Sequence, residues 1–300
     1  MLGKNVEFVT RFYGERLLPL LLVSLESLQT QEPDVAVKVF VSDVSQESID
    51  LLQRAFPGLG FNLVGNIEKS LRESHAVRAS RKFTIFEYLL KNSDNSDYFT
   101  YIFDCDLIFR KAIIDELLGE WDLLVTLRSG KWPLNSGLVG IQHNPLTHEF
   151  VSRVSRINSE ILSSSSMSEL ATQKFGGPDQ AAYSTVLKDY GIRLDKVNRE
   201  KRSLHLASSE LRVETVPCGL YNAHYLEHIS DQSRVIHLKS GWQQLILGER
   251  GYTKSFPKAL AQPIVEEFRS YLRAVLERVP EYRRSRVFRS LGKVRGLYRP

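Results

Sequence analysis

Hydrophobic and polar residues follow one another in short segments typical of strands and helices. β-Branched and aromatic runs predict strands, and apolar residues at helical spacing predict helices. In the first hundred residues strands are predicted at 5–10, 35–41 and 61–64, and helices at 15–29, 45–55 and 79–91. Because strands that alternate with helices over short links form parallel sheets covered by helices, this pattern predicts an α/β fold.

The second half of the chain mixes strands, helices and loops. Strands are predicted at 121–126, 135–141 and 234–238, helices at 147–162, 179–190 and 263–279, and a flexible break at the four serines 163–166. We expect a mixed, mainly parallel sheet flanked by helices over residues 1–255. A helical, basic C-terminal extension is expected over 256–300.

The run from Tyr98 to Arg110 is the most apolar strand of the pattern, and Asp104 and Asp106 interrupt it. Side chains two apart on a strand point to the same face. Two carboxylates on one face of a buried strand repel each other and lose solvation, so a divalent cation between them would stabilise them. The alternative is a pair of carboxylates at the exposed end of a strand.

Residues that follow the first predicted strand should lie on the same edge as the two aspartates. In parallel sheets ligands bind beyond the carboxyl ends of the strands. Thr10, Phe12 and Tyr13 come at the end of the first strand and are therefore candidate ligand-binding residues.

Composition and charge indicate the cellular compartment of the protein and the part of the chain that carries its positive charge. Two cysteines in 300 residues argue against a disulfide framework and fit a reducing compartment, and no apolar signal segment opens the chain. The net charge of +5 is concentrated in residues 281–300, which hold seven cations and one acid. The basic surplus therefore concerns the partner of the tail and not the ligand of the body.

Four blocks, in order, resemble the GT-A fold glycosyltransferases, and family 8 of these enzymes in particular. They are Phe-Asp-Cys-Asp at 103–106, Asn-Ser-Gly-Leu at 135–138, Gly-Pro-Asp-Gln at 177–180 and His-Leu-Lys-Ser-Gly-Trp at 237–242. The last block lacks the family's Lys-Pro-Trp ending. Arg78 and Arg81, before the first block, resemble residues of the blood-group-type transferases.

The resemblance implies a retaining, metal-dependent hexosyltransferase that uses a nucleotide-sugar donor, most simply a UDP-sugar. Asp104, Asp106 and His237 would bind Mn²⁺ or Mg²⁺. Asp179 and Gln180 would lie at the reacting carbon, with Gln180 steadying its positive charge. Further donor-binding residues would be Thr10, Phe12, Tyr13, Arg78, Arg81, Asp104, Asn135, Ser136, Lys239 and Gly241.

Each of these residues also has a structural alternative. His237 could be a hydrogen-bonded core histidine, Lys239 a solvated lysine, Asp179 the N-cap of a helix and Asn135 a turn residue. At the level of the whole protein, the alternatives are an inactive nucleotide-sugar-binding or scaffold protein and a haloacid dehalogenase-type phosphatase. The glycine-rich loop of a sugar nucleotidyltransferase is absent.

The tail predicts where such an enzyme would work. The helix predicted from Pro263 carries apolar residues at helical spacing, and further apolar residues lie among seven cations over 281–300. Both features fit a tail, from about Pro263 onward, that lies in the headgroup region of an anionic membrane. We therefore expect a cytoplasmic enzyme, peripheral on a membrane, that acts on a glycan or lipid-linked acceptor in polysaccharide or lipopolysaccharide biosynthesis. The alternatives are a solvated tail or a nucleic-acid contact, and the body offers no basic face for nucleic acid.

Overall fold

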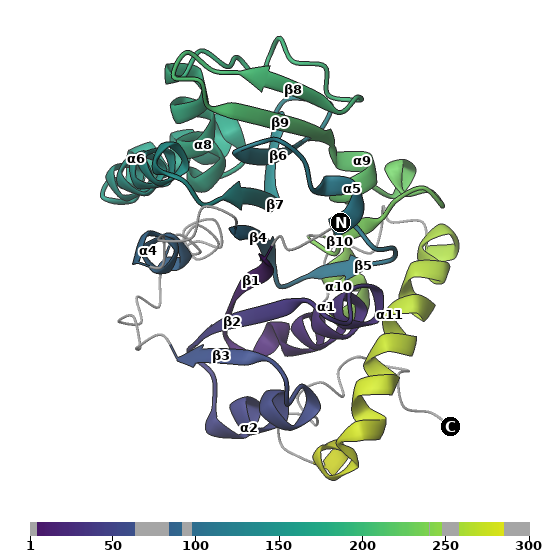
Figure 1. Cartoon of the computed structure of the whole chain (residues 1–300). Coiled ribbons are helices and arrows are strands. Elements are labelled where there is room, and N and C mark those ends of the chain that lie inside the picture. Colours follow the sequence, from purple (N-terminus) through teal and green to yellow (C-terminus); the bar gives the residue numbers. More distant parts are fainter. Residues whose placement is uncertain (1–4, 64–83, 92–97, 240, 248–257, 285–300) are drawn as a thin grey trace. The chain divides into compact units, whose positions relative to one another are not determined.

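The structure is a computed structural model, and it describes residues 5–63, 84–91, 98–239, 241–247 and 258–284. The described residues form two compact units. One unit draws on the described residues within 1–11, 68–104 and 116–222, and the other on those within 12–67, 105–115 and 223–300. Most of the elements are labelled in Figure 1.

The first unit is built on strands that pair in both directions. β1 (Asn5–Tyr13) pairs in parallel with β4 (Tyr98–Asp104), and β4 pairs antiparallel with β7 (Leu134–Gln142). The remaining strands are β6 (Leu123–Leu127), β8 (Ser203–Leu206) and β9 (Arg212–Pro217). β6 lies between β7 and β9, antiparallel to the first and parallel to the second, and β8 pairs antiparallel with β9.

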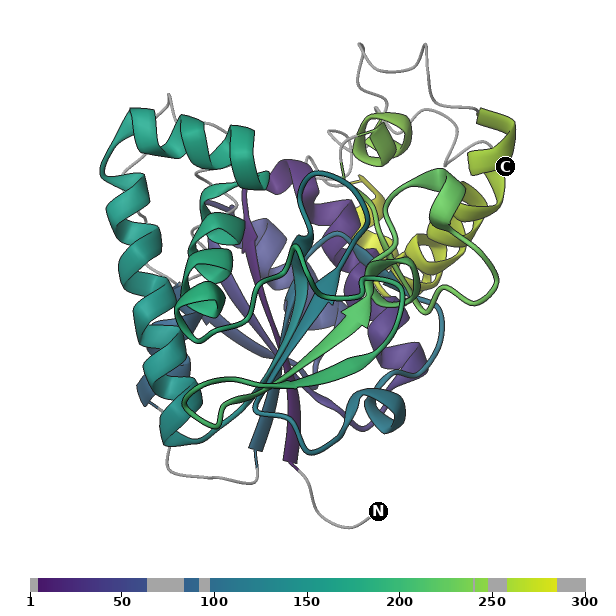
Figure 2. The ribbon, with the colours of Figure 1, turned by 90° about the horizontal axis from the view of Figure 1, so that it is seen from above.

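Three helices lie together on one side of these strands (Figure 2). They are α6 (Pro145–Leu162), α7 (Ser165–Phe175) and α8 (Pro178–Asp189), and α8 packs on α6, α7 and β7. The shorter helices are α4 (Thr84–Lys91), which packs on α6, and α9 (Cys218–Tyr221). The first turn of α8 contacts β7 through the hydrogen bond from Ser136 to Asp179.

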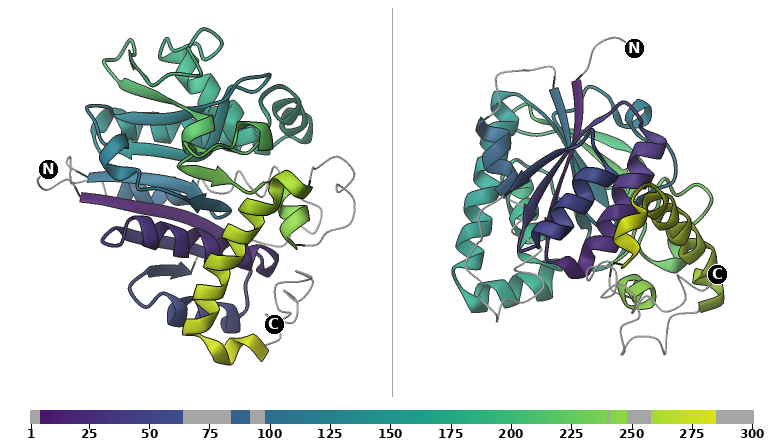
Figure 3. Two further views of the ribbon diagram at one scale, coloured as in Figure 1. Left: turned by 90° about the vertical axis from the view of Figure 1, so that its right-hand side faces the viewer. Right: turned by 90° about the horizontal axis from the view of Figure 1, so that it is seen from below.

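The second unit contains the remaining elements. Its strands are β2 (Ala36–Ser42), β3 (Gly60–Leu63), β5 (Leu107–Phe109) and β10 (Val235–His237). Its helices are η1 (Glu15–Leu17), α1 (Leu18–Gln31), α2 (Gln46–Ala55), η3 (Leu226–His228), α10 (Gly241–Leu247), α11 (Lys258–Arg278) and η4 (Pro280–Arg284). The short helix α5 (Ile114–Leu117) has residues assigned to both units. α11 packs on α1 and α2 (Figure 3).

Helix α1, which corresponds to the helix predicted at 15–29, is buried on all its faces over most of its length. Every residue from Leu18 to Leu28 is buried, including Ser24, Glu26 and Ser27. The polar side chains have partners: Ser24 and Ser27 hydrogen-bond to the backbone of the β5 region, and Glu26 pairs with Arg278. The helix is thus covered on all sides because α11 and β5 pack against it.

The strands follow the order β3-β2-β1-β4-β7-β6-β9-β8, with β5 and β10 as a separate pair. The prediction of a mixed sheet flanked by helices is therefore confirmed. The domain boundary expected at 255/256 falls outside the described residues and stays a prediction. Among the described residues, no helix is both long and apolar enough to cross a membrane.

Two local predictions were wrong. The run 98–110 is not one strand, because β4 ends at Asp104, Cys105 and Asp106 form a turn, and β5 then begins. Strand alternation therefore does not place the two aspartates on one face. The serines are not a flexible break, since Ser164 caps α7 by accepting a hydrogen bond from the Met167 N–H. Helix α7 and strands β8 and β9 were not predicted.

Candidate active site

The turn between β4 and β5 is fixed by hydroxyl groups on neighbouring elements. The hydroxyl of Thr10 donates to the Phe103 carbonyl at 2.7 Å. That of Ser24 reaches the carbonyls of Cys105 and Leu107, at 3.0 and 2.6 Å. Thr10 and Ser24 are both fully buried. Phe103, Cys105 and Leu107 are the chain neighbours of Asp104 and Asp106. The hydroxyls of Thr10 and Ser24 therefore fix the backbone that carries the two carboxylates.

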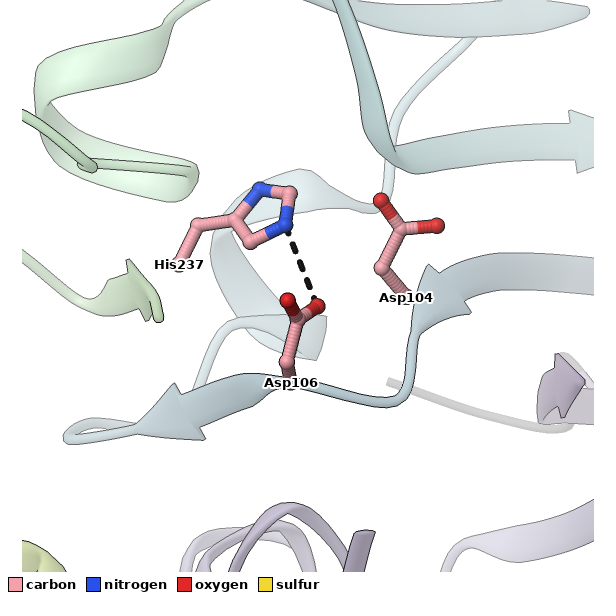
Figure 4. A group of neighbouring side chains, drawn as sticks. All are labelled: Asp104, Asp106 and His237. Carbon is pink, nitrogen blue, oxygen red and sulfur yellow. Dashed lines mark ion pairs between the residues drawn. The ribbon is translucent and has the colours of Figure 1, made fainter. Parts of the chain in front are cut away.

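His237 is placed beside Asp106 by strand pairing. β10 runs antiparallel to β5, with His237 opposite Leu107. The Leu238 N–H donates to the Asp106 carbonyl at 2.8 Å. As a result, His237 Nε2 lies 3.1 Å from Asp106 Oδ1, and both side chains are buried (Figure 4).

The second oxygen of Asp106 is held by α10. Gln243 Nε2 donates to Asp106 Oδ2 at 2.7 Å. Burial raises the pKa of Asp106, but the charge and hydrogen bond of His237, the hydrogen bond of Gln243 and the charge of Lys239 outweigh it. The pKa of Asp106 is therefore lowered to about 2. The carboxylate is charged throughout the physiological pH range.

Asp104, Asp106 and His237 each offer a ligand atom, and these atoms lie within 4.8 Å of one another. Two carboxylate oxygens and one imidazole nitrogen suit Mn²⁺ and, with more oxygen ligands, Mg²⁺. Asp104 is partly exposed, whereas Asp106 and His237 are buried. The three residues could therefore supply the protein ligands of a divalent cation. Because Asp104 is partly exposed, further ligands could reach the cation from that side.

A second group of polar side chains surrounds the start of α8. The helix begins at Pro178, and Gly177 is its N-cap, without a side-chain hydrogen bond. Asp179 is therefore not the N-cap that was the alternative for it. Its carboxylate instead accepts a hydrogen bond from the Ser136 hydroxyl at 2.5 Å. The Asn-Ser-Gly-Leu and Gly-Pro-Asp-Gln blocks thus meet through Ser136 and Asp179.

The next residue of α8, Gln180, is held by a residue that the sequence did not point out. Arg128, directly after β6, donates from Nη2 to Gln180 Oε1 at 2.9 Å. Tyr183, one turn further along α8, is fully buried. Burial and the charges of Asp179 and Asp104 raise the pKa of Tyr183 well above its usual value, so the phenol stays neutral.

Asn135 belongs to a buried network of four side chains and is not a turn residue. Its amide donates to the Cys218 thiol at 3.3 Å, and its side-chain oxygen accepts from the Gly137 N–H. Thr126 donates to the Asn135 carbonyl and accepts from Asn222. The network fixes the strand that carries Ser136.

The remaining predicted residues occupy varied positions. Phe12 is fully buried and Tyr13 and Lys239 are half-buried. Gly241 is the first residue of α10. Arg78 and Arg81 lie outside the described residues. The roles predicted for these residues stay predictions.

Arg128 and Gln243 were missed because a lone arginine or glutamine has no distinctive pattern. Each makes its contact across a long stretch of sequence, to Gln180 and Asp106 respectively. The weak signal for Gln243 was its place two residues after the His-x-x-x-Gly block. For Arg128 the only signal was a cation at the end of an apolar strand.

No protein-family model matches the chain, and no curated protein matches it. It is similar to solved structures of glycosyltransferases. One is LgtC, a galactosyltransferase in complex with donor and acceptor sugar analogs, with a TM-score of 0.55 and 13% identity over 89% of this chain and 95% of that chain.

Two larger proteins match in the same way. GlyE of Streptococcus pneumoniae TIGR4 has a TM-score of 0.52 and 12% identity over 93% of this chain and 64% of that chain. The bifunctional glycosyltransferase WbbM has a TM-score of 0.53 and 9% identity over 94% of this chain and 52% of that chain. The chain thus spans less than two thirds of GlyE and about half of WbbM. These likenesses establish the fold, which is that of the GT-A glycosyltransferases.

Proposed function

We propose that the protein is a metal-dependent glycosyltransferase that moves a hexose from a nucleotide-sugar donor, a UDP-sugar in the simplest case, to a glycan or lipid-linked acceptor. The observation that carries the proposal is the grouping of Asp104, Asp106 and His237 within 4.8 Å in a GT-A fold. His237 comes from a strand remote in sequence, which argues against a chance pair of surface carboxylates.

Asp104, Asp106 and His237 would hold Mn²⁺ or Mg²⁺. When bound, the ion would neutralise the charge that grows on the diphosphate leaving group. Gln243 keeps Asp106 oriented for this task, and Lys239 adds positive charge close to it. The pKa of about 2 keeps Asp106 charged for binding a cation at any working pH.

The start of α8 would bind the donor sugar. Asp179 and Gln180 lie in its first turn, and Ser136 and Arg128 hold their side chains. Asp179 can accept hydrogen bonds from sugar hydroxyls. We propose retention of the anomeric configuration, because the four-block resemblance is to retaining enzymes.

The decisive experiment is a screen of nucleotide sugars for donor hydrolysis and transfer, with Mn²⁺ and with excess chelator. We expect turnover of at least one UDP-hexose with Mn²⁺ and loss of turnover with chelator. Asp106→Ala should lose activity and keep its fold, as judged by circular dichroism. NMR of the product linkage then tests retention.

Full turnover in chelator or in Asp106→Ala would overturn the metal-dependent mechanism. Donor binding without turnover, in every metal tried, would support the alternative of an inactive nucleotide-sugar-binding protein. An inverted product would contradict retention and make one of the carboxylates the base.

The basic tail supports a role at a membrane. Residues 281–300 hold seven cations among apolar residues, but 285–300 lie outside the described residues. Helix α11 does not share this role through its apolar side, because Ile264, Phe268, Leu272 and Val275 are buried within its unit. We propose that the tail alone attaches the enzyme to the cytoplasmic face of an anionic membrane, where a lipid-linked acceptor would be found.

A further inference from the structure

Arg128 and Gln180 form a buried hydrogen bond between the end of β6 and the first turn of α8. Arg128 Nη2 lies 2.9 Å from Gln180 Oε1. The two residues are only 7% and 8% exposed. A hydrogen bond from a charged donor in such surroundings is among the stronger ones in proteins. The contact therefore fixes the orientation of the Gln180 side chain.

Arg128 is itself held in place by the loop that follows it. Its backbone N–H donates to the Pro133 carbonyl at 2.7 Å, and its Nε donates to the Trp132 carbonyl at 2.5 Å. The guanidinium carbon also lies 5.8 Å from the centroid of the Trp132 ring. Arg128 is thus a fixed group and not a mobile surface cation.

Gly176 makes room for this arrangement. Its φ is 88°, in the left-handed region that favours glycine. A Cβ at this position would lie 3.2 Å from Arg128 Nη2, 3.3 Å from the Trp132 ring and 3.4 Å from Gln180 Oε1. A residue larger than glycine at position 176 would therefore crowd the side chains of Arg128, Trp132 and Gln180.

The chemistry of arginine decides which end of Gln180 faces outward. A guanidinium has donors only, so the group that faces Arg128 must be the carbonyl oxygen of the amide. The amide nitrogen consequently points away from Arg128. Within the part of the chain that the structure describes, the Gln180 side chain makes no other hydrogen bond. Its two N–H donors are available to a ligand.

We propose that Arg128 is a positioning residue that makes Gln180 a hydrogen-bond donor to an oxygen of the donor sugar. This inference rests on the proposed function and specifies the site further. It differs from a role in which the Gln180 carbonyl steadies positive charge at the reacting carbon, because that oxygen is already engaged by a cation. The sugar must then present an oxygen, and not a cationic centre, to Gln180.

The kinetic test is Gln180→Glu, assayed with the UDP-hexose that the wild type turns over best. Glutamate keeps an oxygen for Arg128 and replaces the outward N–H donors by an acceptor. We expect kcat/KM to fall about 100-fold, the size of effect seen when one donor to the reacting substrate is removed. The melting temperature should not fall, because Arg128 keeps its partner. Equal or faster turnover would overturn the proposal.

A second readout does not depend on activity. In protein labelled with ¹⁵N in glutamine side chains, the Gln180 amide signals are those missing from Gln180→Glu. Arg128→Lys should shift these signals, because a lysine cannot also keep the contact to the Trp132 carbonyl. Arg193→Lys, at an exposed residue paired with Asp195, is the matched control and should leave them unchanged. Signals that stay in place in Arg128→Lys would overturn the positioning role.

The two readouts separate this inference from the proposed function. If the wild type turns over no UDP-hexose, the proposed function fails while the NMR experiment still decides how Gln180 is held. If turnover is found and Gln180→Glu is as active as the wild type, the proposed function stands and the donor role of Gln180 is wrong.

Discussion

Asp106 is the residue on which most contacts of the candidate metal site converge. Its two oxygens face His237 and Gln243, and its carbonyl accepts from the Leu238 N–H. A carboxylate buried to this degree would ordinarily become protonated more easily. Here its partners reverse the effect, so the Asp106 carboxylate stays charged although it is buried.

This environment predicts a pH dependence of stability. The pKa of Asp106 falls from 3.8 to about 2 on folding, so the charged form stabilises the folded state above pH 4. The contribution, about 2 kcal/mol, is lost as the pH falls from 4 to 2. Urea unfolding of metal-free protein at several pH values in this range should show a steeper loss of stability for the wild type than for Asp106→Asn. Parallel curves would contradict the assignment.

At the level of elements, α11 belongs to the core of its unit. Phe268 and Val275 are fully buried, and the helix packs on α1 and α2. Two ion pairs fix it at the edges, Arg110 with Glu267 and Arg278 with Glu26. The apolar face that suggested a membrane-associated helix is therefore used for packing within the protein.

The packing of α11 can be tested by a cavity-forming substitution. Phe268→Ala should lower the free energy of unfolding by about 3–5 kcal/mol, since it removes a fully buried aromatic ring. Glu277→Ala, on the exposed side of the same helix, should change it by less than about 0.5 kcal/mol. Both values come from urea unfolding followed by fluorescence. A loss below about 1 kcal/mol for Phe268→Ala would mean that α11 is not part of the core.

For the whole molecule, charge is distributed very unevenly along the chain. The net charge is +5, and residues 281–300 alone hold seven cations against Glu281. The rest of the chain is therefore close to neutral. A body without a net basic surplus gives nucleic acid less to bind than the tail gives an anionic membrane, so we propose the membrane as the partner of the tail.

Deletion of residues 281–300 should abolish co-sedimentation with vesicles that contain anionic lipid, since each cation near such a surface contributes about 1 kcal/mol. The full chain should bind these vesicles at low salt and dissociate as salt rises, and vesicles of neutral lipid serve as the control. Equal binding by both forms, or binding that ignores salt and lipid charge, would contradict a membrane role for the tail.

The sequence by itself determined the elements and the order of the site blocks. Local patterns predicted β1, β2, β7, α2, α6 and α8 within a few residues, because periodicity depends on neighbours in the chain. They missed β8 and β9, which are only four and six residues long, and α7, whose serines begin a helix instead of breaking one.

The tertiary structure decided how the site is assembled. Asp104 and Asp106 were expected to converge by strand alternation, yet a turn separates them. His237 reaches Asp106 only because β10 pairs with β5, and Arg128 meets Gln180 only because α8 packs on the strands. Such contacts join residues far apart in sequence. They depend on burial and pairing that no local pattern encodes, so a sequence can name the ligands of a site but not the residues that orient them.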